Sequence, residues 1–165
     1  MAQPQEAPPK GERPGMQKSY GIHGGDEGLV PWSEVAARLE SSRNYWIGTT
    51  QADGKPHAMP VWGVWANGAV VFGTDKNSRK ARNIIRQPEV VAHLESGDDV
   101  VIIEGTARMV TDKSEIAAVN ALYQKKYAMK LTDAPGELFV CAVEPRIVFA
   151  WHEKDYPKSA TRFQF

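Results

Sequence analysis

From Tyr45 onward the apolar residues occur in short runs separated by turn residues, a pattern typical of β-strands. The runs predict strands over residues 45–50, 57–65, 69–74, 90–95, 100–110, 138–143 and 147–151. Asp53-Gly54 and Asn67-Gly68 are tight-turn sequences that join the first three runs as hairpins. Pro145 is expected to separate the last two runs. The two glycine turns that join the first three strands therefore predict an antiparallel meander there.

Helices are expected to begin at Pro31, Ser78 and Asp112. The first helix is amphipathic, with Val35 and Leu39 on its apolar face. The second is stopped by Pro88. The third has a capping box formed by Asp112 and Glu115, and it extends to about Tyr127.

About six antiparallel strands with a few short helices and no internal repeat predict a mainly β (α+β) fold of the closed-barrel type. A two-sheet sandwich is the nearest alternative. Residues 1–28 carry four of the eleven prolines and show no apolar periodicity, so we expect a mobile N-terminal arm there. Residues 29–165 are then one domain.

Composition excludes several classes of function. The 165 residues contain 20 basic and 20 acidic side chains, so no overall charge favours a nucleic acid. No uncharged apolar run approaches the length of a membrane span, and no secretory signal is visible in the first 20 residues. Cys141 is the only cysteine and is expected to be an inert core thiol. These features indicate a cytoplasmic protein without membrane or nucleic-acid partners.

Metal binding is not expected either. The four histidines, His23, His57, His93 and His152, are scattered through the chain without the spacing of metal ligands. The sequence also contains no Gly-rich dinucleotide loop and no phosphate-binding Walker loop.

The densest local charge lies directly after the third predicted strand. Five basic residues, Lys76, Arg79, Lys80, Arg82 and Arg86, fall within eleven positions. Ser78 is the expected N-cap of the helix that begins there, and a helix start attracts phosphate through its free amides and its partial positive charge. The hydroxyls of Thr74 and Ser78, together with Arg79 and Lys80, would supply charge-assisted donors around a dianion. A solvated basic helix start without a ligand is the alternative.

The sequence Thr74-Asp75-Lys76-Asn77-Ser78-Arg79-Lys80 resembles the phosphate-binding segment of pyridoxamine 5'-phosphate oxidases and their relatives, in which a Ser-Arg-Lys run follows the third strand. Residues 46–62, WIGTTQADGKPHAMPVW, resemble the opening hairpin of the same family. The resemblance extends from about Val30 to Trp151. It implies a six-stranded antiparallel split β-barrel of the FMN-binding type. It also implies a homodimer with two cofactors at the subunit interface.

The chain ends in Thr161-Arg162-Phe163-Gln164-Phe165, where authentic pyridoxamine-phosphate oxidases carry an Arg-x-His substrate motif. This ending resembles that of actinobacterial relatives that use the deazaflavin coenzyme F-420, and pyridoxamine-phosphate oxidase activity is therefore not expected. The resemblance implies that the ring system lies along Met59, Pro60, Val61 and Trp62. It implies that the phosphate and anionic tail are held by Thr74, Lys76, Ser78, Arg79, Lys80 and Asn83.

We therefore expect an F-420-dependent oxidoreductase that transfers a hydride to a small electrophilic organic substrate. An FMN-dependent flavoprotein of the same fold is the first alternative, because FMN needs the same phosphate site. A non-catalytic flavin- or haem-binding module is the second. No residue is singled out as catalytic, because in such chemistry the cofactor performs the difficult step. Trp62 and Trp65 should face opposite sides of one strand, so one can be buried while the other borders the ring or the dimer interface.

Overall fold

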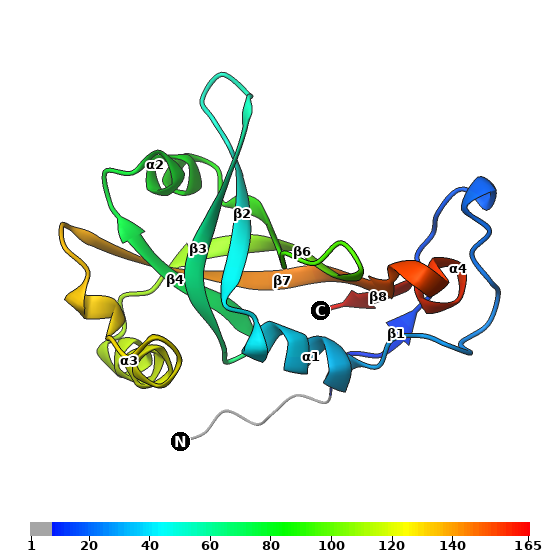
Figure 1. Cartoon of the computed structure of the whole chain (residues 1–165). Coiled ribbons are helices and arrows are strands. Elements are labelled where there is room, and N and C mark those ends of the chain that lie inside the picture. Colours follow the sequence, from blue (N-terminus) through cyan, green and yellow to red (C-terminus); the bar gives the residue numbers. More distant parts are fainter. Residues whose placement is uncertain (1–7) are drawn as a thin grey trace.

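The computed structural model describes residues 8–165 and shows one antiparallel sheet with helices at its ends and sides (Figure 1). The strands are β1 (Gly11–Glu12), β2 (Asn44–Thr50), β3 (Pro56–Ala66), β4 (Ala69–Asp75), β5 (Glu89–His93), β6 (Asp99–Met109), β7 (Leu138–His152) and β8 (Thr161–Gln164). The helices are α1 (Trp32–Ser41), α2 (Arg79–Arg86), α3 (Lys113–Tyr127) and α4 (Tyr156–Ser159), with 3-10 turns η1 (Lys18–Tyr20), η2 (Leu131–Asp133) and η3 (Glu153–Asp155).

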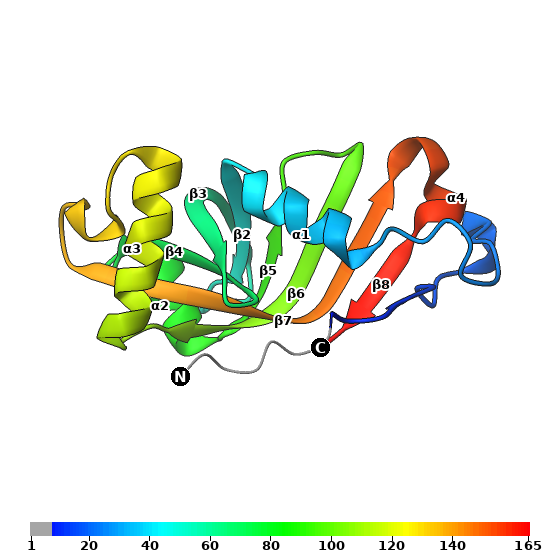
Figure 2. The same ribbon diagram turned by 90° about the horizontal axis from the view of Figure 1, so that it is seen from below.

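Six of the strands close into a barrel. Their order is β7-β4-β3-β2-β5-β6, and β6 pairs again with β7. Beyond β7 the sheet continues into β8 (Figure 2) and then β1 (Figure 1), outside the closed part. The predicted six-stranded antiparallel split barrel is confirmed, and the sandwich alternative is wrong because the first and last strands of the six pair with each other.

Strand β7 runs without a break through Pro145, so the prediction of two separate strands was wrong. The register with β6 shifts between Glu104 and Gly105, which leaves Arg146 as the extra residue of a bulge. A proline is tolerated at a bulge because no ladder hydrogen bond is required there. Gly105 is needed opposite the bulge, since a Cβ at that position would lie 2.3 Å from the Glu144 carbonyl oxygen.

The barrel interior is filled by alternate residues of the strands. Its largest fully buried side chains include Tyr45, Ile47, Phe72, Val101 and Ile103. Helix α1 begins after Pro31 as predicted and adds Val35 and Leu39 to this core. Helix α3 packs on the outer face of β4 and β7 instead, in a second cluster that contains Val71, Val119, Tyr123, Val140 and Ala142. The two clusters lie on opposite faces of β4, and the second one forms part of the site described below.

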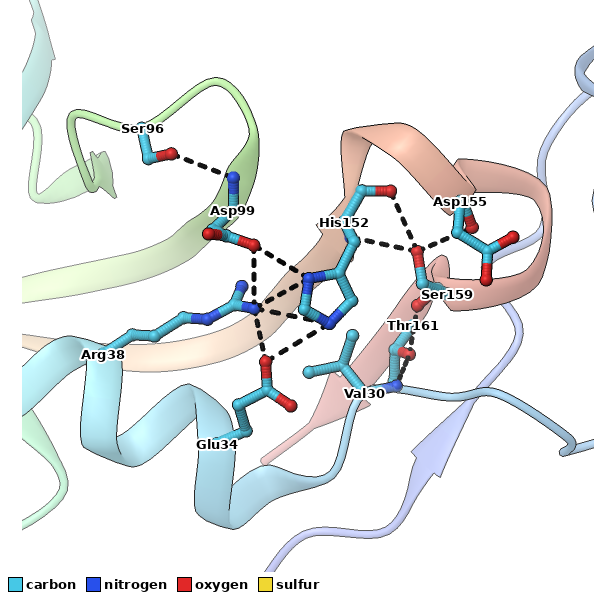
Figure 3. Close-up of polar contacts among 9 residues, drawn as sticks. All are labelled: Val30, Glu34, Arg38, Ser96, Asp99, His152, Asp155, Ser159 and Thr161. Atoms are coloured by element: carbon cyan, nitrogen blue, oxygen red, sulfur yellow. Dashed lines mark hydrogen bonds and ion pairs between the residues drawn. The ribbon is translucent and has the colours of Figure 1, made fainter.

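A polar cluster connects α1 to the start of β6 and the end of β7 (Figure 3). His152, the last residue of β7, lies with Nδ1 2.8 Å from Asp99 Oδ1 and with Nε2 3.2 Å from Glu34 Oε1. Arg38 Nη2 contacts both carboxylates, at 3.3 Å in the case of Asp99. The hydrogen bond from His152 and the nearby Arg38 charge lower the pKa of Asp99. The cluster joins α1, the start of β6 and the end of β7 at a point that lies outside the split of the barrel.

The expected N-terminal arm, residues 1–28, contains more structure than its composition indicates. Residues 1–7 lie outside the described part of the chain. Beyond them, β1 pairs with β8 through Gly11↔Phe163 and Glu12↔Arg162. The Arg13 guanidinium donates to the carbonyls of Gly25 at 2.8 Å and Ala160 at 3.1 Å. Mobility of the arm stays a prediction, and these contacts argue against it for residues 11–25.

The helices are short, and the longest, α3, has 15 residues. Across residues 8–165, no helix combines the length and the apolar character needed to cross a bilayer. The cytoplasmic location stays a prediction.

Candidate functional site

Strands β3 and β4 separate after four residue pairs, and this split is the start of the site. Their register runs from Ala66↔Ala69 to Gly63↔Phe72. Beyond that point β3 continues along β2, and β4 continues along β7. Pro60 lies on the freed edge of β3, where its missing N–H leaves no ladder bond unmade. The split therefore exposes strand backbone that a ligand can contact.

A pocket of about 290 Å³ lies in the split. Its wall is formed by Pro60, Val61, Trp62, Gly73, Thr74, Asp75, Lys80, Tyr123, Met129, Leu131, Ala134, Pro135 and Leu138. The structure thus brings together five of the predicted cofactor residues, namely Pro60, Val61, Trp62, Thr74 and Lys80. Most of the other wall residues are apolar, and a pocket of this kind with a few convergent polar groups is typical of a cofactor site.

The polar end of the pocket lies where β4 leads into α2. Ser78 is the N-cap of α2, as predicted, and its Oγ accepts from the Ala81 amide at 3.1 Å. Thr74 Oγ1 lies 3.1 Å from Ser78 Oγ, and Lys80 Nζ donates to Thr74 Oγ1 at 3.0 Å. Two hydroxyls, one ammonium group and a helix start therefore converge. This set, Thr74, Ser78 and Lys80 with the first amides of α2, is called the cradle below.

Lys80 dominates the electrostatics of the cradle. Its side chain is only 9% exposed, and none of the ion pairs formed within residues 8–165 includes it. Burial lowers the pKa of Lys80. A buried ammonium without a carboxylate is costly, and an anion beside it would offset that cost. The cradle therefore favours a phosphate.

Asn83 lies beside the cradle on the buried face of α2. Its Nδ2 donates to Thr49 Oγ1 at 3.0 Å, and Thr49 Oγ1 lies 3.4 Å from His57 Nδ1. Partial burial and the positive charges of Arg79 and Lys80 lower the pKa of His57. Asn83 thus points to the barrel strands and does not line the pocket, and its predicted role in phosphate binding stays a prediction.

Three further predicted residues lie at the surface outside the pocket wall. Met59 is 47% exposed on β3, and Arg79 is exposed at the first position of α2. Lys76 is also exposed, and its Nζ lies 3.8 Å from Glu137 Oε2. The structure places Lys76 and Arg79 next to the cradle in the chain, where they could meet a charged group that extends outward from the pocket.

Sequence reasoning missed the wall formed by α3 and the segment that links α3 to β7. Met129, Leu131, Ala134 and Pro135 of this segment line the pocket. Leu131 is buried against the backbone of Gly73, where a Cβ would lie 2.5 Å from Leu131 Cδ1. The alternation of Met129 and Leu131 with lysine in a segment without a predicted element was the available signal. Its partner across the split could not be read from the sequence.

The two tryptophans of β3 lie in different surroundings, and their roles beside a ring or a dimer interface stay predictions. Trp62 lines the pocket, is 43% exposed and stacks on Tyr127 with ring centroids 4.8 Å apart and an angle of 2°. The Arg43 guanidinium lies over the Trp62 ring of this stack, 5.3 Å from the ring centroid. Trp65 is half-buried and meets Trp32 edge-on at 6.2 Å against the core. Trp62 is therefore the aromatic residue at the rim of the pocket.

Cys141 is fully buried in β7, and burial raises its pKa to about 12. The expectation of an inert core thiol is confirmed. Within residues 8–165, His, Cys, Asp and Glu side chains form no group of three placed to hold a metal ion.

The fold and the pocket define a split-barrel protein with a phosphate-type cradle beside an apolar slot. Residues 32–152 match the sequence profile described as pyridoxamine 5'-phosphate oxidase. Because this match covers most of the chain, the protein belongs to the pyridoxamine 5'-phosphate oxidase family. A search of curated protein sequences finds no match.

Solved structures with the same fold include proteins with different roles. A conserved hypothetical protein of Mycobacterium tuberculosis is 23% identical with a TM-score of 0.68, over 78% of this chain and 88% of that one. A structure named F420 reductase is 23% identical with a TM-score of 0.56, over 68% and 93%. A haem storage protein of Vibrio cholerae is 17% identical with a TM-score of 0.59, over 68% and 88%. At this level of identity the similarity establishes the fold alone.

Proposed function

We propose that this protein is an oxidoreductase that binds the deazaflavin coenzyme F-420 in the split between β3 and β4. The observation that carries the proposal is the buried Lys80 ammonium, which lies at the start of α2 and faces the pocket without a carboxylate partner among residues 8–165. A cofactor phosphate supplies the anion that this position lacks. The F420 reductase among the structures of the same fold is consistent with this proposal.

In this proposal, three groups of residues contact three parts of the cofactor: the phosphate, the ring and the tail. The cradle holds the phosphate through Lys80 and the Thr74 and Ser78 hydroxyls. The ring lies along the free edge of β3, with Trp62 on one side and the apolar α3–β7 segment on the other. Lys76 and Arg79, exposed beside the cradle, meet the carboxylates of the tail.

Bound F-420 supplies the hydride, and the chain contributes position and surroundings. The wall residues Met129, Leu131 and Pro135 limit the access of water to the ring. Asp75 is the only acidic residue in the pocket wall, and its Oδ1 is already used to accept from the Asn77 amide at 2.7 Å. We assign no proton donor. The substrate proposed is a small electrophilic organic molecule that fits over the ring in the apolar slot.

FMN is the alternative cofactor, because it ends in a phosphate that the same cradle would hold. The two cofactors differ beyond the phosphate, where F-420 continues into a lactyl group and several glutamates. Exposed contacts of Lys76 and Arg79 with those carboxylates are worth roughly 0.2–1 kcal/mol each and weaken with salt. The preference for F-420 over FMN therefore depends on ionic strength.

Titration of each cofactor by fluorescence quenching at low and high salt tests the proposal. We expect F-420 to bind more tightly than FMN at low salt and the difference to shrink as salt rises. Equal affinities at low salt, or FMN bound after purification, would favour the FMN alternative.

Absorbance of the purified protein separates the remaining possibilities. Oxidised F-420 gives one band at about 420 nm, a flavin gives two bands, and haem gives a Soret band. With pre-reduced F-420, appearance of the band of the oxidised cofactor on adding an electrophilic substrate marks an enzyme, because the hydride leaves the cofactor for the substrate. A cofactor that binds but never turns over across a screen of enones and unsaturated lactones would mark a binding module instead.

A further inference from the structure

The point where β3 and β4 separate is held by helix α3. We call this point the fork, and it consists of Trp62 and Gly63 on β3 with Phe72 and Gly73 on β4. The register of the two strands ends at Gly63↔Phe72. The next residue on each strand, Trp62 and Gly73, already lines the pocket. The width of the pocket at this end therefore depends on how Trp62 and Gly73 are held.

Three side chains of α3 bind the β3 backbone at the fork. Tyr123 Oη donates to the Trp62 carbonyl at 2.6 Å. Tyr127 Oη accepts from the Gly63 amide at 2.9 Å and lies 2.7 Å from the Gly63 carbonyl oxygen. Lys126 Nζ donates to the same carbonyl at 3.0 Å. The strand is thus fastened by a helix that begins about 50 residues further along the chain.

Tyr123 differs from the other two because it is itself part of the pocket wall. It is only 3% exposed, and burial raises its pKa well above the usual value, so the hydroxyl keeps its proton. This hydroxyl therefore holds the β3 side of the fork through the Trp62 carbonyl. Leu131, packed on Gly73 from the adjoining segment, supports the β4 side.

We propose that Tyr123 is the positioning residue that sets the ring-binding end of the pocket. Its hydroxyl holds the Trp62 carbonyl at a fixed place beside Gly73, and the free edge of β3 from Trp62 to Pro60 takes its direction from that point. The identity of the ring rests on the proposed function, whereas the fastening of the fork does not.

Riboflavin and FMN separate the ring site from the cradle, because riboflavin has the same ring without the phosphate. We expect Tyr123→Phe, which removes only the hydroxyl, to weaken riboflavin and FMN by the same factor, about five- to tenfold. Lys80→Ala should weaken FMN and leave riboflavin unchanged. Tyr156→Phe is the control, because it removes another tyrosine hydroxyl, one that donates to Met16 Sδ at 2.7 Å away from the pocket and the fork.

Equal affinities of wild type and Tyr123→Phe for riboflavin would overturn the proposal, and so would equal losses in Tyr123→Phe and Tyr156→Phe. Amide hydrogen exchange of the ligand-free protein distinguishes this failure from a failure of the proposed function. We expect the Gly63 amide, which belongs to the same peptide group as the Trp62 carbonyl, to exchange several-fold faster in Tyr123→Phe, while the Val71 amide, within the paired part of β4, keeps its rate. If wild type binds neither F-420 nor a flavin, the proposed function fails. Faster Gly63 exchange would then still support the fastening, and an unchanged rate would overturn it as well.

Discussion

Lys80 is both buried and charged, and this unfavourable combination distinguishes the site from the rest of the barrel. Lys80 is only 9% exposed as a residue, and its ammonium group has a single hydroxyl acceptor, Thr74 Oγ1, so burial disfavours its charged form. The same position is among the most favourable in the chain for a phosphate, because the start of α2 adds its free amides to the ammonium group. An anionic ligand bound at this position would therefore offset the cost of burying the Lys80 charge.

The effect of Lys80→Ala on cofactor affinity tests this interpretation. The substitution removes a charge-assisted bond worth about 1.5–3 kcal/mol, which corresponds to a loss of about ten- to a hundredfold in affinity for a phosphate-bearing cofactor. Arg86→Ala is the control on the same helix, because Arg86 donates to the Thr50 carbonyl away from the pocket. Isothermal titration of both variants with F-420 or FMN measures the difference. Equal losses would indicate a diffuse basic surface instead of a specific cradle.

At the scale of elements, α3 replaces part of the strand pairing that the split removes. Its N-cap, Asp112, accepts from the Glu115 amide as predicted, but the Glu115 carboxylate does not complete the capping box. It pairs with Arg108 of β6 at 2.7 Å instead. The other end of the helix carries Tyr123, Lys126 and Tyr127 to the β3 backbone. The helix is therefore fixed to the barrel at both of its ends.

Lys126 makes the contact between α3 and β3 sensitive to pH. Its Nζ lies 5.0 Å from the Tyr45 ring centroid, and burial lowers its pKa from 10.5 to about 8. Between these two values the unfolded chain holds a proton that the folded chain has released, so the free energy of unfolding rises with pH. Below about pH 8 both states are protonated, and the contribution is constant. The gain is modest, because the side chain is half-exposed and screened by solvent.

Urea unfolding of Lys126→Met at pH 7.5 and pH 10, compared with wild type, measures this contribution. We expect wild type to gain stability relative to the variant as pH rises through this range. Lys125→Met, at the exposed neighbouring position, should change in parallel with wild type. A parallel change in Lys126→Met too would show that Lys126 keeps its ordinary pKa.

At the scale of the whole molecule, one outer face of the barrel carries apolar side chains toward solvent. The register places Trp46, His93, Ile102 and Phe149 in one row across β2, β5, β6 and β7. A second row contains Gly48, Val91, Glu104 and Ile147, and Val91 is 37% exposed. Contiguous apolar surface of this kind usually marks an interface. We propose that a second copy of the chain covers it and that the cofactors lie at the interface.

Light scattering at micromolar concentration tests the homodimer. We expect a mass of twice the 18.3 kDa of one chain. Phe149→Lys, which places a charge at the β7 end of the first row, should give the mass of one chain. Leu122→Lys is the matched control, since Leu122 is an exposed apolar residue on α3. A single-chain mass for wild type with cofactor present would contradict the proposal.

Local sequence signals were enough to predict strands β2 to β6, helices α1, α2 and α3, and the polar half of the site. Short-range signals, such as the Asp53-Gly54 turn and the Ser78 cap, act between residues that are already neighbours in the chain. The cradle could be predicted for the same reason, because Thr74, Ser78 and Lys80 lie within seven positions.

The position of the split and the residues that face the cradle depend on contacts between distant parts of the chain. The fork joins Trp62 to Tyr123, 61 positions apart, and Leu131 meets Gly73 across a similar distance in sequence. The bulge that carries β7 through Pro145 likewise depends on Gly105 of another strand. Such contacts depend on how the sheet closes on itself, and closure is set by the packing of all six strands together. The local sequence around any one of these residues therefore does not predict its partner.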